Sequence, residues 1–572
     1  MRKLTAVFTK KLIPVYCALA VLFFAFRDDD LFQVSKNLDI FASLYKELNI
    51  NYVEEINSSE FIHTGIDAML NSLDPYTEFV PESEIEDYRL KYVSTQYGGI
   101  GASIFTKGGK VIVSEPYEGF PAQKNDIRAG DEILQINGVS TKNKTNEEVS
   151  LMLKGPKNTP LKMVFQRPGE KDRIEKTITR EEIIQRNVSY YGMLNKDVGY
   201  IKLDKFLENS AQEVRDALVD LQKNNPTGVV LDLRHNGGGI LQEAVKIINF
   251  FVDKDATVVT QKGKVKEKVI NYRTVYTAIA GNLPLVVLVD SRSASASEIV
   301  AGSLQDLDRA IIIGERSFGK GLVQQTFNLP YNSLVKVTVA KYYTPSGRCI
   351  QALDYVHKQA DGTAVKFADS LITEFKTKGG RSVYNGSGVY PDISVKDDSF
   401  HSITKTLVAK QLIFDYSTLY RNKNTAIPGA HEFQLTDYEY AGFVGFLSNK
   451  DYNYSTNTEK LLNDLKSEAD KENKMPEIKS EFEALKSKVF YSKKDDLTQF
   501  KEEIKRVLEN EIVSRYYFQK GRVENNFRHD EDIKAAVNVL NDKTKIASVL
   551  KGEGTYKIIG RPQSFLSARA EK

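Results

Sequence analysis

Three short apolar runs constrain the fold of this chain more than any other feature. They lie at residues 228–234, 285–289 and 310–314, and valine, leucine and isoleucine dominate each of them. Near-continuous apolar runs of this length are typical of strands that are buried on both faces of a sheet. Helical patterns such as 241–251 separate the runs. Strands that alternate with helices predict an α/β layer structure, which we place at residues 190–395.

The rest of the 572-residue chain adds further units, because this length suggests roughly three to five domains. Residues 28–92 carry apolar side chains at helical spacing, which predicts an N-terminal helical module. Residues 93–182 change to short strands. Residues 396–572 read as a helical C-terminal region, in which interspersed lysine and glutamate indicate solvated helix faces and no catalytic constellation stands out. The expected fold class is therefore multidomain α+β.

Composition excludes several classes of protein. A hydrophobic fraction of 41% and a charged fraction of 27% are those of a globular chain. The net charge is +3 and the two signs are interspersed, so no nucleic-acid footprint stands out. Six histidines and two cysteines are scattered without metal-ligand spacing, which argues against a zinc site. Because Cys17 lies in the leader and Cys349 is alone, there is no disulfide framework.

The first 27 residues have the pattern of a secretory leader. Basic residues precede an apolar run from Leu12 to Phe26; they are Arg2, Lys3, Lys10 and Lys11. A basic segment followed by an apolar run is typical of a signal peptide. The run is also shorter than the roughly 20 residues of a membrane span. No clean small-x-small cleavage site precedes Arg27, so an uncleaved anchor stays open, as does a buried core helix. The basic residues would keep the start cytoplasmic and send the remainder across the membrane.

A serine-rich turn carries the first candidate catalytic residue. Ser295 lies where the apolar run 285–289 is expected to pass into a helix that includes Glu298. One interpretation is purely structural, because Ser-x-x-Glu is a helix capping box. The other is a nucleophile, since Ala294 and Ala296 leave room for a substrate and a helix N-terminus stabilises developing negative charge. A serine hydroxyl also needs a neighbouring base to take its proton.

Lys320, between Gly319 and Gly321, is the candidate base. The structural alternative is a solvated lysine on a turn. A lysine that acts as a base must be neutral, which requires a pKa lowered by desolvation or by nearby positive charge. Gln324 is four residues on in a strand-like run, and even spacing along a strand puts two side chains on one face. A neutral amide can orient the lysine without raising its pKa, as a carboxylate would.

The strand-rich residues 93–182 resemble a PDZ domain. The resemblance implies a β-barrel-like fold for this part of the chain. The match includes the glycine-rich start at 97–104 and the Asn137-Gly138 hairpin signal. The resemblance implies an edge strand that accepts an extended peptide. Its glycines would let backbone N–H groups converge on a carboxylate, although a plain glycine turn is the alternative. The candidate peptide-binding residues are Tyr97, Gly98, Gly99, Ile100 and Gly101.

Residues 60–395 as a whole resemble the carboxy-terminal processing peptidases, also called tail-specific proteases. The motifs are Ser-Ala-Ser-Ala-Ser-Glu at 293–298, Gly-Lys-Gly at 319–321, Asp-Leu-Arg-x-Asn-x-Gly-Gly at 232–239 and Tyr-Thr-Pro-Ser-Gly-Arg at 343–348. The resemblance implies a ClpP/crotonase-like α/β protease core, no metal or nucleotide cofactor, and a catalytic set of Ser295, Lys320 and Gln324. The oxyanion N–H groups that it implies belong to Gly238, Gly239 and Ala296.

Some members of that family are described with a third catalytic residue, an aspartate, which would match Asp306. Eleven residues of continuous helix span about 16 Å, too far for contact with Ser295. We therefore expect Asp306 to have a structural part.

Together these observations predict a serine endopeptidase that recognises protein C-termini through a PDZ domain and cleaves by acyl-enzyme chemistry with a Ser/Lys dyad. Its partners would be protein substrates with free C-termini, and ligand-driven movement of the PDZ domain could gate the site. The alternatives are a non-catalytic PDZ scaffold and an acyl-CoA hydratase-like enzyme. The leader predicts the periplasm or cell envelope of a bacterium, with inner-membrane anchoring, a homo-oligomer and an adaptor all left open.

Overall fold

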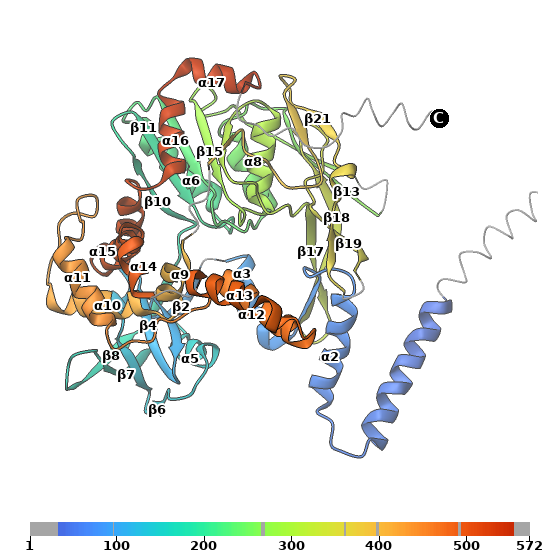
Figure 1. The fold of residues 1–572 in the computed structure, drawn as a ribbon. Helices are drawn as coiled ribbons and strands as arrows, with labels where there is room; N and C mark the ends of the chain where they lie inside the picture. The colour runs from blue at the N-terminus through green and yellow to red at the C-terminus, as the bar shows by residue number, and fades with distance from the viewer. Residues whose placement is uncertain are drawn as a thin grey trace, which may run out of the picture.

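The structure is a computed structural model that describes residues 32–94, 96–264, 269–359, 362–395, 400–489 and 493–553. The predicted leader, residues 1–27, lies outside these ranges. Within them, no helix combines the length and the apolar character that crossing a membrane requires. Figure 1 shows the resulting arrangement, with an α/β layer structure, a separate β-rich domain and two helical units.

A six-stranded sheet forms the centre of the α/β layer structure. Its order is β10 (Val188–Met193), β11 (Val198–Leu203), β12 (Gly228–Asp232), β15 (Leu285–Val289), β16 (Ile311–Gly314) and β23 (Ile393–Ser394). All neighbours are parallel except the β10–β11 pair at the edge. Every residue of β12, β15 and β16 is buried. The prediction of buried parallel strands from the three apolar runs is thus confirmed.

Helices cover both faces of this sheet. One face packs against α6 (Ser210–Gln222), α7 (Leu241–Asn249) and α8 (Ala296–Asp306). The other face packs against α16 (Glu531–Leu540) and α17 (Lys543–Leu550), which come from the far end of the chain (Figure 1). Alternation along the strands explains this, since Val229 and Leu231 face the first set of helices while Val230 faces the second. The C-terminal region therefore contributes to the core of the α/β unit.

A second, antiparallel sheet stands beside the first (Figure 1). Its long central strand β18 (Ser333–Tyr343) pairs along one side with β17 (Leu322–Leu329). Its other side pairs with β1 (Glu78–Val80) and with β13 (Thr257–Gly263), which in turn pairs with β14 (Ile270–Arg273). Nearby lie two small hairpins and a 3₁₀ turn: β19 (Leu353–Lys358) with β20 (Ala364–Lys366), β21 (Glu374–Lys376) with β22 (Ser382–Tyr384), and η2 (Asp369–Leu371).

The β-rich domain has its own apolar core. Its sheet runs β3 (Ala102–Lys107), β4 (Lys110–Pro116), β5 (Glu132–Ile136), β7 (Pro160–Gln166) and β8 (Arg173–Thr179), with β6 (Val139–Ser140) on β5. The helices are α4 (Pro121–Lys124) and α5 (Asn146–Leu153), and β2 (Gln96–Gly99) pairs with β9 (Glu181–Ile184) where the chain enters and leaves. Among the described strands β3 pairs only with β4, so one of its edges is open.

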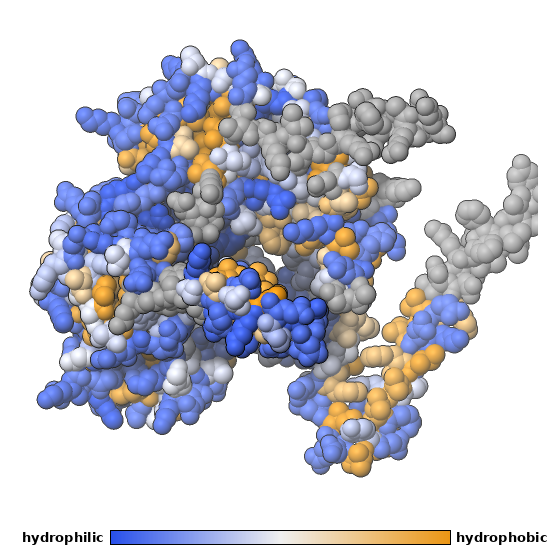
Figure 2. Space-filling model, viewed as in Figure 1, coloured by the Kyte–Doolittle hydropathy of each residue, from blue (hydrophilic) through white to orange (hydrophobic). Residues whose placement is uncertain are grey.

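The N-terminal module consists of a helix over residues 32–51, α2 (Ser58–Asn71), the 3₁₀ turn η1 (Glu82–Glu84) and α3 (Ile85–Tyr92). The first two helices project away from the rest of the molecule in Figure 1 and carry a broad apolar surface in Figure 2. The large apolar side chains that they expose include Phe32, Leu38, Phe41, Leu44, Ile50 and Val53. The predicted helical character of this part is confirmed, but little of it is buried.

The C-terminal helical unit packs around a separate core. It comprises α9 (Ser402–Ala409), α10 (Leu412–Lys423), α11 (Asp437–Leu447), α12 (Asn457–Lys471), α13 (Met475–Val489), α14 (Lys493–Gln499) and α15 (Lys501–Asn526). It contacts the β-rich domain through Lys107 and Asp415, 2.8 Å apart, and through the edge-to-face rings of Phe105 and Phe414. Since α15 leads directly to α16, this unit connects the β-rich domain to the central sheet.

Candidate active site

Ser295 lies at the turn between β15 and α8. Its backbone has φ +56° and ψ −112°, a region that residues other than glycine rarely adopt. Strained backbone of this kind concentrates at functional sites. The turn places Ser295 at the N-terminus of a buried helix, where the helix dipole favours negative charge.

Glu298 holds the serine turn and the lysine loop together. The capping interaction expected from the sequence is present, because Ser295 N–H donates to Glu298 Oε2 over 2.8 Å. The same carboxylate also accepts from the N–H groups of Lys320 (2.8 Å) and Gly319 (2.7 Å), and from the Ser317 hydroxyl (2.5 Å). Burial raises the pKa of Glu298, while these hydrogen bonds oppose the shift. The Ser-x-x-Glu spacing predicts Glu298 only as a helix cap. It does not predict the contacts of this carboxylate with the lysine loop.

The Lys320 side chain is partly buried and its amine faces an aromatic ring. Nζ lies 4.1 Å from the centroid of the Tyr76 ring. Burial, and secondarily the positive charge of Lys336, lower the pKa of Lys320 to about 8. The hydroxyl of Tyr342 donates to the backbone carbonyls of both Lys320 (2.9 Å) and Ser295 (3.2 Å). The lysine therefore has the lowered pKa that a base requires, on a backbone tied to the serine turn.

Gln324 lines the same cleft as Lys320, but the two residues do not lie on one continuous strand. Strand β17 begins at Leu322, after Lys320, and its register shifts between Val323 and Gln324. Even spacing along a strand therefore does not account for the shared location of Lys320 and Gln324, because Lys320 precedes the strand. Gln324 Nε2 donates to the Thr338 hydroxyl over 3.1 Å, so its amide is anchored to β18.

Gly238, Gly239 and Ala296 line the same cleft as Ser295. The two glycines have φ of +95° and +146°, which favours glycine. Gly238 N–H donates to Asn236 Oδ1 over 2.9 Å. Among the described residues, the N–H groups of Gly239 and Ala296 have no hydrogen-bond acceptor. Of the three N–H groups predicted to bind an oxyanion, these two therefore have no acceptor within the described part of the chain.

Replacing Gly238 by alanine is expected to lower kcat by about 100-fold or more. A Cβ there would lie 2.6 Å from the Ala294 carbonyl oxygen and 2.8 Å from Ala296 N, so the loop or the serine turn must shift. Peptide hydrolysis by the purified variant, with Gly237→Ala as the matched control, measures the effect. A Cβ at Gly237 meets nothing within 4 Å, and equal loss in both variants would contradict the steric explanation.

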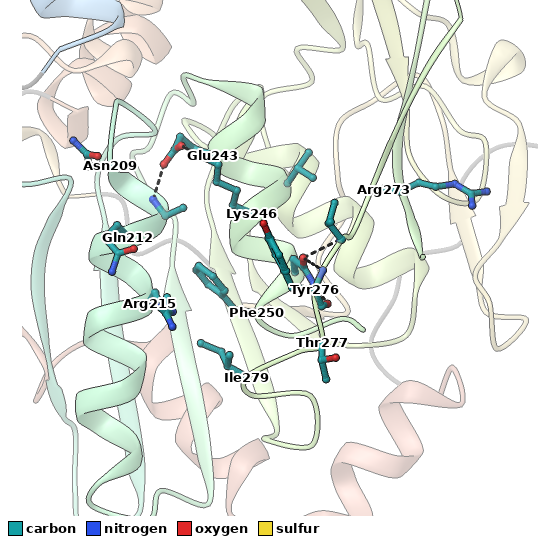
Figure 3. Close-up of a pocket in the computed structure, with 14 residues that line it drawn as sticks. Asn209, Gln212, Arg215, Glu243, Lys246, Phe250, Arg273, Tyr276, Thr277 and Ile279 are labelled. Carbon is teal, nitrogen blue, oxygen red and sulfur yellow. Dashed lines mark hydrogen bonds and ion pairs between the residues drawn. The ribbon is translucent and has the colours of Figure 1, made fainter. Parts of the chain in front are cut away.

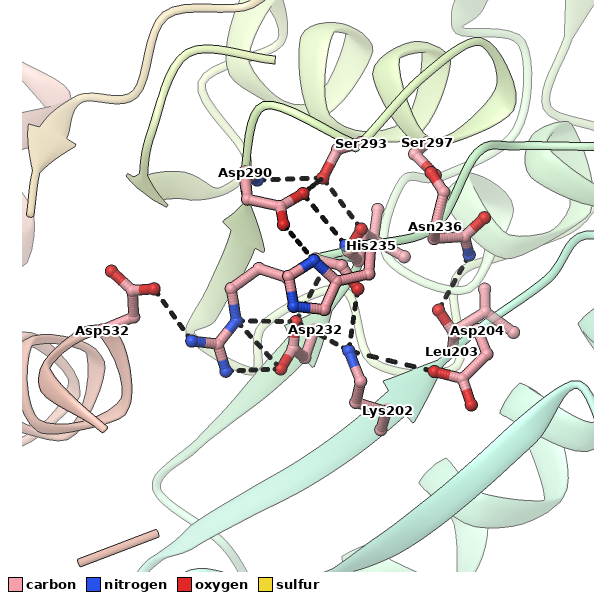
Figure 4. A network of polar contacts seen from close by, with 12 residues as sticks. Lys202, Leu203, Asp204, Asp232, His235, Asn236, Asp290, Ser293, Ser297 and Asp532 are labelled. Atoms are coloured by element: carbon pink, nitrogen blue, oxygen red, sulfur yellow. Dashed lines mark hydrogen bonds and ion pairs between the residues drawn. The ribbon is translucent and has the colours of Figure 1, made fainter. Parts of the chain in front are cut away.

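A polar network holds the loop of residues 235–239, which follows β12 (Figure 4). Asn236 Nδ2 donates to the Leu203 carbonyl over 2.8 Å, and the Asn236 carbonyl accepts from the Ser297 hydroxyl over 2.8 Å. Asp290 Oδ1 accepts from His235 N–H over 2.9 Å, and its carboxylate also contacts the His235 ring. Although burial alone would raise it, the pKa of Asp290 is held below its usual range by His235. The loop is thus fixed to β11 and to the serine turn.

A cluster of charges joins this loop to the C-terminal helices. Arg234 lies 2.7 Å from Asp232 at the end of β12 and 2.8 Å from both Asp530 and Asp532, which flank the start of α16. In Figure 4 a dashed line joins Asp532 to the arginine side chain that lies between it and Asp232. Asp232 also lies 3.4 Å from Lys202. The residues that precede the loop 235–239 are therefore bound to the far end of the chain.

One cleft of about 780 Å³ brings the predicted catalytic and oxyanion residues together. Its lining includes Ser295, Lys320 and Gln324 together with Gly238, Gly239 and Ala296. Residues of α3 from the N-terminal module and of β17 and β18 form part of the remaining walls, together with residues of α7, β13 and β14.

The β-rich domain has a second groove, of about 440 Å³, between β3 and α5. Of the five residues predicted to bind peptide, Tyr97 lines it. Gly98 and Gly99 pair with β9, and Ile100 packs into the domain core. Gly101, with φ +71°, turns the chain into β3. The groove itself lies beside the open edge of β3.

Asp306 lies at the opposite end of α8 from Ser295. Its carboxylate pairs with the fully buried Arg348 over 2.9 Å and accepts from Ser346 N–H over 3.0 Å. The aspartate thus anchors the loop after β18, in agreement with the structural part expected for it.

A separate pocket of about 650 Å³ lies between α6, α7 and residues 273–279 (Figure 3). It shares no lining residue with the cleft. Its buried polar groups are engaged internally: Glu243 accepts from Ala211 N–H over 2.8 Å, and Asn249 accepts from Tyr276 N–H over 2.9 Å. We assign this pocket no chemistry.

Comparison with known proteins agrees with this architecture. The family model for peptidase family S41 matches residues 197–356, that for the PDZ domain matches 92–166, and that for the probable PDZ-protease C-terminal helical domain matches 403–540. The chain is 35% identical over 346 residues to a probable CtpA-like serine protease of Staphylococcus aureus (strain MRSA252), covering 59% of this chain and 68% of that protein.

Two further proteins share much of the chain. A carboxy-terminal-processing protease of Bartonella bacilliformis is 33% identical over 352 residues, which cover 60% of this chain and 80% of that protein. The solved photosystem II D1 C-terminal processing protease is 28% identical and covers 57% of this chain and 90% of its own, with a TM-score of 0.32. The chain therefore belongs to the S41 family of serine peptidases, among the carboxy-terminal-processing proteases that carry a PDZ domain.

Proposed function

We propose that this peptidase cleaves proteins through an acyl-enzyme formed on Ser295, with Lys320 as the base. One observation carries the proposal: both residues line one cleft, and a single buried carboxylate, Glu298, binds the backbone N–H groups of both. Their relative position is thereby built into the fold. The lowered pKa of Lys320, about 8, supports its role as a base.

The reaction follows from these groups. With a pKa of about 8, roughly one lysine in ten is neutral at pH 7. The neutral amine takes the Ser295 hydroxyl proton as Oγ attacks the carbonyl carbon. The N–H groups of Gly239 and Ala296 donate to the oxyanion, each contributing about 3–4 kcal/mol. The Lys320 ammonium then gives its proton to the leaving amine, and water releases the acyl group by the same steps.

We further propose that the PDZ domain selects substrates by their free C-termini. The open edge of β3 beside α5 supports addition of an extended peptide as a further strand. Ala102 and Ile104 supply the apolar floor of that groove. Lys154 of the groove also pairs with Asp87 of α3 over 2.6 Å, and α3 in turn lines the catalytic cleft. Peptide capture and cleavage therefore occur on connected elements.

The leader supports a proposal about location. Basic residues followed by an apolar run over residues 12–26 favour export to the periplasm or cell envelope of a bacterium, either with cleavage or as an inner-membrane anchor. The exposed apolar side chains of the projecting N-terminal helices are where we expect a homo-oligomer to form.

The test uses a folded reporter protein with an unstructured apolar tail, offered either with a free C-terminal carboxylate or as the C-terminal amide. We expect the wild-type enzyme to cleave the carboxylate form at least about tenfold faster in kcat/KM, because the amide lacks the charge that the PDZ groove would recognise. Mass spectrometry identifies the new termini, and Ser295→Ala is the control. Equal cleavage of the two reporters would overturn C-terminal recognition, while cleavage by Ser295→Ala would overturn the nucleophile. A scaffold would bind the carboxylate form and cleave neither.

A further inference from the structure

The N-terminal module reaches into the candidate active site through one side chain. Tyr76 belongs to the turn that follows α2 and precedes β1, and its ring lies 4.1 Å from Lys320 Nζ. Among the described residues, Lys320 Nζ has no hydrogen bond or ion pair, to Ser295 or to any other group. The aromatic face of Tyr76 is therefore the direct contact that the structure describes for this amine.

The turn that presents the ring is held firmly. Asp74 is 7% exposed, and its Oδ1 accepts from the N–H groups of Tyr76 and Thr77, both over 2.8 Å. Thr338 N–H of β18 donates to the Thr77 hydroxyl over 3.2 Å. At its other end, the Tyr76 hydroxyl lies 3.2 Å from the hydroxyl of Tyr355, whose ring packs edge-on against it. The ring is fixed at both its backbone and its hydroxyl.

An aromatic face distinguishes the two protonation states of a lysine. It attracts an ammonium ion through the ring quadrupole but offers little to a neutral amine. The reaction needs the opposite state, since only the neutral amine can accept the serine proton. Contact with the ring thus stabilises the form of Lys320 that cannot act as a base.

We propose that Tyr76 is a positioning residue of the dyad, whose ring holds the protonated Lys320 side chain in a resting orientation and frees it when the proton leaves. The inference rests on the proposed role of Lys320 as the base. It makes the N-terminal module a component of the active site as well as a wall of the cleft. It also explains why the amine is oriented without a hydrogen bond to the serine.

Several charges act on Lys320 together with the ring. Burial and Lys336 on β18 lower its pKa, whereas Asp74, Glu78 of β1 and Glu298 of α8 raise it. Lys336 is itself 2.5 Å from Glu78 and 4.1 Å from the centroid of the Tyr92 ring. All of these groups stay in place when only the ring at position 76 changes, so the contribution of the ring can be isolated.

The test compares Tyr76→Leu with Tyr76→Phe in the full-length enzyme. In the wild type, kcat/KM should rise with pH with an apparent pKa of about 8. Tyr76→Leu keeps an apolar side chain but removes the quadrupole, so we expect the apparent pKa to fall by about 0.5–1.5 units, which moves activity toward lower pH. Tyr76→Phe keeps the ring face and is expected to leave the profile in place.

Three outcomes would overturn the proposal: an unchanged profile in Tyr76→Leu, a shift to higher pH, or equal shifts in both variants. A merely structural role would lower kcat or the melting temperature without moving the pH profile. If Tyr76→Leu does not fold, phenylalanines of increasing fluorination at position 76 keep the packing and weaken the quadrupole, and the apparent pKa should fall with each added fluorine. A failure of the proposed function can be told apart from a failure of this inference. If Lys320 is not the base, Lys320→Ala retains activity, whatever the variants at position 76 do.

Discussion

Replacing Lys320 by alanine is expected to lower kcat by about 10⁴-fold or more, and adding Ser295→Ala to it is expected to lower the rate no further. Catalytic groups that act as a unit are strongly non-additive, and the rate that remains comes from the oxyanion N–H groups and substrate binding. The structure links Ser295 to Lys320, because Glu298 and Tyr342 each form hydrogen bonds with the backbone of both residues. Single-turnover cleavage of a peptide by the two single variants and the double variant measures the effect.

The matched control is Lys223→Ala, which removes a lysine that pairs with Asp220 on the surface of α6 and should retain wild-type activity. If Lys320→Ala keeps more than about a tenth of the activity, the lysine is not the base. If the double variant is slower than the wild type by the product of the two single losses, the two residues act independently and the dyad is wrong.

The second large effect is expected at Arg234. Replacing it by glutamine should lower the free energy of unfolding by about 3–5 kcal/mol, because removing one member of a buried ion cluster leaves uncompensated charge. Asp232 is fully buried, and although burial alone would raise its pKa, Arg234 and Lys202 hold that pKa well below its usual range. Without Arg234, three carboxylates would face one another between β12 and α16. Urea unfolding followed by circular dichroism measures the loss at pH 7.

Asp532→Asn is the matched control within the same cluster. Burial raises the pKa of Asp532 to about 6, against the opposing effect of Arg234. Because this pKa lies above the roughly 3.9 of an unfolded aspartate, the fold favours the protonated form, and stability is lost as pH rises through about 6. Asp532→Asn should therefore cost little at pH 7. The penalty of Arg234→Gln should shrink between pH 7 and pH 5, and a penalty that is equal at both values would contradict this explanation.

Arg234→Gln should also lower kcat more than it raises KM. The arginine precedes the loop 235–239, and its partners Asp530 and Asp532 tie that loop to α16. A loosened loop places the Gly239 N–H less well for the transition state, while substrate binding in the PDZ groove is unchanged.

Much of this structure was predictable because the signals are local. A run such as Leu285–Val289 can be stable only where both of its faces are buried, which predicts a central parallel strand. The backbone at residues 238 and 239 adopts positive φ, and residue 238 lies close to the serine turn, so glycine is favoured at both positions. The Ser-x-x-Glu spacing predicted the capping contact between Ser295 and Glu298. Each of these inferences depends on residues that are near one another in the chain.

The remaining features depend on contacts between distant segments, which no local spacing encodes. Tyr76 meets Lys320 only because β1 pairs with β18, and Glu298 reaches the lysine loop only because α8 packs beneath it. Gln324 lines the cleft with Lys320 although Lys320 lies before β17 and the pairing of β17 with β18 shifts at Gln324. Helix α16 covers the central sheet because the sheet has a second apolar face to bury. The amino-acid pattern of α16 alone does not indicate which element it packs against. Composition and periodicity state how much apolar surface an element must bury, whereas the packing of the whole chain determines which element buries it.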